Sequence, residues 1–139
     1  MSVQFVLLPL FVQVLITLAV MYTLAGRRFA TIRGGELRAP VSLREPNWPV
    51  DVRKAEYNYQ NQFELPVLFY VLTILVIITR QADFLFVVLA WVFVVLRAVH
   101  AFVHVTNNNM KIRGPVFIAG AIVLTIMWLI FMVRILLVV

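Results

Sequence analysis

Ionisable side chains interrupt two long apolar segments of this chain. Glu64 stands in one segment, and Arg97, His100 and His104 stand in the next. A charge within a membrane-spanning helix costs about 2.5–3.5 kcal/mol on insertion scales, so it usually has a function or a specific partner. These four groups could form a salt bridge between helices, ligate a metal ion, or carry a proton or cation through the membrane.

The spacing of these residues predicts two polar helix faces. Arg97, His100 and His104 follow each other at i, i+3 and i+7, which places them on one side of a helix. The same period runs through the preceding segment, in Lys54, Tyr57, Asn61 and Glu64. At helical rise, Glu64 lies about 24 Å and Arg97 about 21 Å from the short connector between the segments. We therefore expect the two faces to meet inside a helix bundle or at a subunit interface.

Three interpretations of this polar cluster are open from the residues alone. The first is a salt bridge between Glu64 and Arg97, because charges in membranes usually pair. The second is a metal site of His100, His104 and a carboxylate. Arg97 opposes a dication there, and Ala101 stands where a metallohydrolase helix has its glutamate, so we predict no metal. The third is a transporter built around Glu64, which the surrounding positive groups disfavour.

The composition excludes several classes of protein. The chain is 63% hydrophobic and only 13% charged, which is too apolar for an ordinary soluble domain. It has no cysteine, so disulfides, thiolate metal sites and a cysteine nucleophile are ruled out. The net charge of +6 is not accompanied by a nucleic-acid-binding motif, and we expect no nucleic-acid partner. The composition indicates an integral membrane protein.

Four apolar stretches are long enough to cross a hydrocarbon core of about 30 Å. They cover residues 3–25, 58–79, 84–105 and 115–133. The four residues between the second and third stretches force an antiparallel hairpin. Residues 27–56 form a long polar connector, in which Gly34, Gly35 and three prolines predict a loop with turns. Pro66 predicts a kink in the second span. We expect the whole chain to form one all-α four-transmembrane-helix bundle.

Basic residues are distributed unevenly between the connectors. Two positions, Arg80 and Arg134, lie on one side of the four spans. Nine lie on the other side, namely Arg27, Arg28, Arg33, Arg38, Arg44, Arg53, Lys54, Lys111 and Arg113. The positive-inside rule then places the first and third connectors in the cytoplasm and both termini outside. The same basic residues could attract anionic lipid head groups, at about 1 kcal/mol each, and membrane lipid is an expected partner.

The polar residues also resemble those of a known family. The run from Asn61 to Pro66 resembles the Asn-x-x-Glu pattern on the second helix of the MAPEG superfamily, the membrane-associated proteins in eicosanoid and glutathione metabolism. A second match resembles that family's third helix and the start of its fourth, in Arg97, His100, His104, Asn107 and Arg113. The resemblance is strongest between Lys54 and Phe117, and the four-span layout also fits.

This resemblance implies a homotrimer of four-helix subunits that binds glutathione between neighbours near the cytoplasmic face. It implies that Asn61 and Glu64 contact the tripeptide and that Arg113 is catalytic, because it stabilises the thiolate. A free thiol has a pKa of about 8.5, and a nearby arginine lowers it. We expect His104 to help hold the peptide, and Arg97 and His100 to orient Glu64 from behind.

The chain differs from many characterised members at several of these positions. Tyr57 and Gln60 stand where they carry arginines, and His104 and Phe117 stand where they carry tyrosines. Gly114 stands where some prostaglandin synthases have a serine. These differences argue against a eukaryotic eicosanoid synthase and favour a prokaryotic-type member in the inner membrane.

The expected function is that of a glutathione-dependent transferase or peroxidase. Its second substrate would be a lipophilic electrophile or hydroperoxide, which lipid-facing grooves between subunits would admit. The alternative is a non-catalytic MAPEG-fold protein that binds membrane or lipid. Arg113 favours the enzyme, and Phe117, which has no hydroxyl to donate, favours the alternative.

Overall fold

The computed structural model describes residues 2–34, 49–106 and 110–137, and every regular element in this part of the chain is a helix. The helices are α1 Val3–Arg33, α2 Val50–Asn61, α3 Leu65–Ile78, α4 Phe84–Val105 and α5 Met110–Leu137. Four stretches are long and apolar enough to cross a membrane, and α2 and α3 together form one of them. The predicted all-α architecture with four membrane-crossing segments is confirmed.

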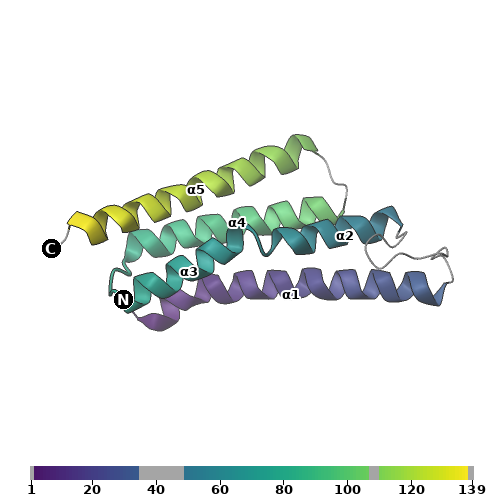
Figure 1. Ribbon diagram of the computed structural model, residues 1–139, viewed down its shortest axis with the longest axis horizontal. Helices are drawn as coiled ribbons and strands as arrows, with labels where there is room; N and C mark the ends of the chain where they lie inside the picture. The colour runs from purple at the N-terminus through teal and green to yellow at the C-terminus, as the bar shows by residue number, and fades with distance from the viewer. Residues whose placement is uncertain (1, 35–48, 107–109, 138–139) are drawn as a thin grey trace.

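The helices run up and down along one long axis (Figure 1). The start of α1, the turn from α3 to α4 and the end of α5 lie at one end of the bundle. The end of α1, the start of α2, the end of α4 and the start of α5 lie at the other. Residues flanking the first and third connectors therefore share one end, which we call the basic end. The side of the membrane that this end faces stays a prediction.

The predicted connector over residues 27–56 is helical at both of its ends. α1 continues to Arg33, and α2 already begins at Val50. An apolar run sets where a chain crosses the hydrocarbon, but not where its helix stops. The extension at the start of α2 also packs against α1 through Leu24, Val52 and Ala55, and Arg28 pairs with Glu56 at 3.4 Å. Arg38, Arg44 and Asn107 lie outside the described residues.

The second membrane span is broken just before Pro66, which goes beyond the predicted kink. α2 ends at Asn61, and Glu64 has non-helical backbone angles of φ −98° and ψ −101°. Proline has no N–H, so the carbonyl of Gln62 loses its helical donor, and the ring clashes with that carbonyl. Short i to i+3 bonds link residues 59–64 instead, including one from the Glu64 N–H to the Asn61 carbonyl at 3.3 Å.

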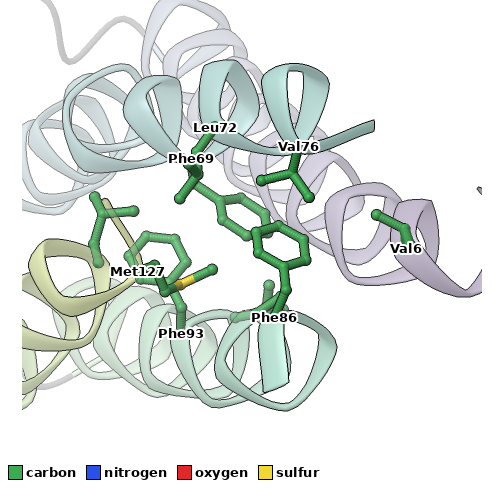
Figure 2. Packing of buried hydrophobic residues seen from close by; sticks show 10 residues of the cluster. Val6, Phe69, Leu72, Val76, Phe86, Phe93 and Met127 are labelled. Atoms are coloured by element: carbon green, nitrogen blue, oxygen red, sulfur yellow. The ribbon is translucent and has the colours of Figure 1, made fainter. Parts of the chain in front are cut away.

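The apolar core occupies the half of the bundle opposite the basic end. It is built on Phe69 of α3 and Phe93 of α4, whose ring centroids lie 5.0 Å apart. Figure 2 shows these rings between α3 and α4, with Met127 of α5 and Val6 of α1 on either side. The buried polar side chains Asn58, Arg97, His100 and His104 lie outside this core, on α2 and the last part of α4.

A chain of buried amides lies near the middle of the bundle, at the helix break. Gln13 of α1 donates through Nε2 to Oε1 of Gln62 at 2.9 Å. Gln62 donates through Nε2 to Oδ1 of Asn58 at 3.2 Å, and Asn58 donates to the Ala101 carbonyl of α4 at 2.9 Å. All three side chains are fully buried. This amide network links α1, α2 and α4 and fixes the direction in which α2 leaves the break.

Asp83 ties α4 to α5 at the end opposite the basic end. Its Oδ1 accepts the Phe86 N–H at 2.9 Å as a helix N-cap, and its Oδ2 pairs with Arg134 at 2.7 Å. We expect Asp83→Ala to lower the free energy of unfolding by about 1–2 kcal/mol, because a lost N-cap costs about 1 kcal/mol. Arg134→Gln should cost only about 0.5 kcal/mol, because exposed ion pairs contribute little.

This difference can be measured by unfolding in detergent micelles, followed by circular dichroism. Asp51→Ala is a matched control, because Asp51 is an exposed acid in the first turn of α2. If Asp83→Ala and Arg134→Gln lower the free energy of unfolding equally, the N-cap hydrogen bond of Asp83 contributes no stability beyond that of the ion pair.

Candidate functional site

A cavity of about 360 Å³ opens between α2, α4 and α5. Its lining consists of Tyr57, Asn61, His100, His104, Arg113, Gly114 and Phe117. The helical period explains this convergence, because Tyr57 and Asn61, His100 and His104, and Arg113 and Phe117 are each four residues apart. These residues lie toward the basic end, where α2 approaches α4 and α5 begins. We call this cavity the polar pocket.

The two histidines form the floor of the polar pocket. His100 is 2% and His104 is 3% exposed, and their rings meet edge to face at 5.7 Å. The Asn61 amide nitrogen lies 3.4 Å from Nδ1 of His104. If the amide donates, that ring is neutral and carries its proton on Nε2. Nδ1 of His100 is buried and has no hydrogen-bond partner among the described residues.

Arg97 lies behind the lining rather than in it. Its side chain is 1% exposed, and Nη2 donates to the Asn61 carbonyl at 3.1 Å. That carbonyl also accepts the short i to i+3 bond from the Glu64 N–H at the break before Pro66, so the guanidinium gives it a second donor. Its carbon Cζ lies 6.0 Å from the ring centroid of Phe117. Nε and Nη1 have no partner among the described residues.

The predicted salt bridge between Glu64 and Arg97 is not formed, although the structure describes both residues. Glu64 is exposed and does not line the polar pocket. In an unbroken helix, Glu64 would lie on the same face as Asn61. The helix ends at Asn61 instead, so Glu64 is not held on that face.

Arg113 supplies the cationic side of the polar pocket. It stands in the first turn of α5 and is half-buried, and Gly114 and Phe117 line the wall beside it. The Phe117 ring lies 5.6 Å from the His100 ring, so α5 packs against the histidine face of α4 at this point. Among the described lining residues there is no carboxylate. With Arg97 behind it, the pocket is suited to an anion.

The structure thus brings together four of the six residues proposed for the site. Asn61, His100, His104 and Arg113 line one cavity, Arg97 supports it from behind, and Glu64 lies outside. Among the described residues, no three histidine, aspartate or glutamate side chains gather in a way that could hold a metal ion.

Sequence reasoning missed the amide network beside the site. The signal was present, because Gln13 is a strongly polar residue in the middle of a charge-free apolar span. A buried amide in such a span needs a partner, and Gln62 and Asn58 are spaced one helical turn apart in the next polar segment.

We expect Arg97→Ala to destabilise the protein by about 2 kcal/mol, because it removes a charge-assisted hydrogen bond from the part-buried Asn61 carbonyl. Arg113→Ala should cost less, because Arg113 is half-buried at the end of the bundle. Thermal unfolding in detergent measures both losses. Arg97→Lys is the matched control, because it keeps the charge but loses the planar fork. A melting temperature for Arg97→Ala at or above that of Arg113→Ala would contradict this role.

Comparison with known proteins gives one match. The model of the MAPEG family matches residues 6–133, which is nearly the whole chain and includes the polar pocket. No curated protein and no solved structure matches the chain.

Proposed function

The chain belongs to the MAPEG family, and we propose that it is a membrane-bound, glutathione-dependent transferase or peroxidase. Family membership supports a membrane function related to glutathione or eicosanoids in general terms. The specific proposal rests on one observation, which is that Arg113 lines the same cavity as Asn61 and His104. The second substrate in this proposal is a lipophilic electrophile or hydroperoxide.

The side chains of the polar pocket fit an anionic thiol. The described lining has a guanidinium and two histidines but no carboxylate, so a negative charge meets attraction rather than repulsion. Nδ1 of His100 and the Nε and Nη1 groups of Arg97 are buried and have no hydrogen-bond partner in the described part of the chain. A bound polar ligand, or water around it, would supply the partners that these atoms lack.

The chemistry follows from the placement of Arg113. Bound glutathione supplies the sulfur nucleophile, whose thiol is mostly protonated at neutral pH unless a cation lowers its pKa. In the proposal Arg113 stabilises the thiolate, and each unit of pKa lowering corresponds to about 1.4 kcal/mol of preferential binding. Asn61, His100 and His104 hold the peptide part, and Arg97 keeps the Asn61 backbone in place. Attack then forms a bond from sulfur to the electrophile while the leaving group takes the electron pair.

Glu64 leads us to include a homotrimer in the proposal. Its carboxylate is exposed on the isolated chain, within a segment that is long and apolar enough to span a membrane. A charge left facing lipid there costs about 2.5–3.5 kcal/mol. We propose that a neighbouring subunit covers Glu64, and that the glutamate reaches glutathione in the interface between subunits. This arrangement would complete the site with a residue that the polar pocket of one chain lacks.

Two residues of the polar pocket favour a second candidate, a non-catalytic MAPEG-fold protein that binds membrane or lipid. Tyr57 and Phe117 give the cavity two aromatic walls, and Phe117 has no hydroxyl to donate. In such a protein, the buried residues Arg97, His100 and His104 would only stabilise the fold.

A glutathione titration of the purified protein separates the two candidates. Calorimetry measures binding, ultraviolet absorbance measures the thiolate, and conjugation to an aryl halide or reduction of a lipid hydroperoxide measures turnover. Binding with a thiolate band and turnover supports the enzyme. Absence of glutathione binding, or binding without a thiolate band and turnover, overturns it.

A further inference from the structure

A second cavity lies on the opposite flank of α4, between α4 and α1. It has a volume of about 240 Å³. Its walls are apolar and include small residues, contributed by Ile16, Ala19 and Thr23 of α1 and by Ala98, Phe102 and Val105 of α4. The Thr23 hydroxyl donates to the Ala19 carbonyl and is therefore satisfied within α1. We call this cavity the α1–α4 groove, and its lining matches a hydrocarbon chain rather than a polar ligand.

One end of the α1–α4 groove carries a cation. Arg27 follows Thr23 by one helical turn, and its Nη2 donates at 3.4 Å to the carbonyl of Val105, which lines the groove. Its Nη1 donates to the Asp51 carbonyl at 2.8 Å. A guanidinium has five N–H donors, so these two bonds leave three for another ligand. Among the described residues no carboxylate forms a salt bridge with Arg27.

The end of the apolar run places Arg27 at the level expected for a phospholipid phosphate. The apolar run of the first span ends at Ala25, so Arg27 stands where the hydrocarbon gives way to the head-group region. The groove extends from this level toward the middle of the bundle, along α1 to Ile16. A phosphate at Arg27 would therefore place an acyl chain directly against the apolar walls.

We propose that the α1–α4 groove binds one acyl chain of an anionic phospholipid, with the head-group phosphate on Arg27. Charge complementarity favours this occupant over a second copy of the chain, because the basic end has an excess of positive charge that would attract an anion and repel the same end of a second copy. The site does not share lining residues with the polar pocket, which α2, α4 and α5 form. The proposal thus stands or falls independently of glutathione binding.

Native mass spectrometry of the full chain in detergent tests the site with phosphatidylglycerol and phosphatidylcholine of identical acyl chains. Arg27→Gln should weaken phosphatidylglycerol binding about fivefold, because one basic residue at the surface contributes about 1 kcal/mol. Phosphatidylcholine has the same phosphate, but its choline cation offsets the charge, so its binding should weaken less. Ala98→Leu fills the groove and should weaken both lipids about tenfold, through the loss of about two buried methylenes.

Two matched controls give the test its specificity. Arg33→Gln removes an exposed charge from the last turn of α1, and Ala25→Leu adds the same bulk to an exposed position outside the groove. Both should bind the two lipids as the wild type does. Equal weakening by Arg27→Gln and Arg33→Gln would overturn the site in favour of general surface attraction. A change in the mass of the assembly with Ala98→Leu, at unchanged lipid affinity, would assign the groove to a second copy.

Discussion

Arg113→Ala should abolish the glutathione thiolate in the polar pocket and lower turnover about 100-fold, which is the usual cost of removing one donor from a developing or resting anion. The thiol would return toward its free pKa of about 8.5 and would be mostly protonated at neutral pH. The measurements are the ultraviolet thiolate band during a glutathione titration and the conjugation rate. Glutathione itself should still bind, although more weakly, because Asn61 and both histidines remain in the pocket.

A control variant distinguishes the effect of the positive charge of Arg113 from that of its planar guanidinium. Arg113→Lys keeps the positive charge but loses the planar fork, so part of the thiolate band should return while the rate recovers less. Arg53→Ala removes an exposed charge at the same end of the bundle and should change neither measurement. An Arg113→Ala protein that retains the full thiolate band at neutral pH would remove Arg113 from the mechanism.

The membrane-crossing architecture could be predicted because it depends on the length and hydropathy of each apolar run. Apolar run length fixes the number of spans, and the four-residue connector fixes the hairpin between the second and third. The helix ends could not be predicted in the same way. Arg27 and Arg33 are polar enough to leave the hydrocarbon, yet they continue α1 because the backbone can bond to itself in either environment.

The site was predictable only where a helix stays intact. His100 and His104 lie on unbroken α4, and their helical spacing correctly places them together. Glu64 lies beyond the last intact turn of α2, so the same spacing misplaces it. Pro66 indicated that the helix would be disturbed, but the direction that the chain takes after a break depends on tertiary partners. Those partners are the guanidinium of Arg97, which bonds to the Asn61 carbonyl, and the amide of Gln13, which bonds to Gln62. Both come from distant parts of the sequence.

Gln62→Leu should cause the largest loss of stability among the substitutions considered, about 2–3 kcal/mol. The change removes the partner of the Gln13 Nε2 group and that of the Asn58 Oδ1 atom, and both are fully buried. A buried polar group left without its partner costs about 1–3 kcal/mol. Because the amide network lies at the helix break, the loss should also increase the mobility of α2 and weaken glutathione binding. Unfolding in detergent, followed by circular dichroism, measures the stability.

The double variant Gln13→Leu, Gln62→Leu tests whether the bond or the shape matters. Removing both partners of a buried hydrogen bond is less costly than removing one, so the double variant should be more stable than Gln62→Leu alone. The difference gives the coupling between the two amides, which for contacting residues is about 0.5–3 kcal/mol. Losses that simply add would show that Gln13 and Gln62 act independently. In that case the break before Pro66 would be held in place by Arg97 and packing alone.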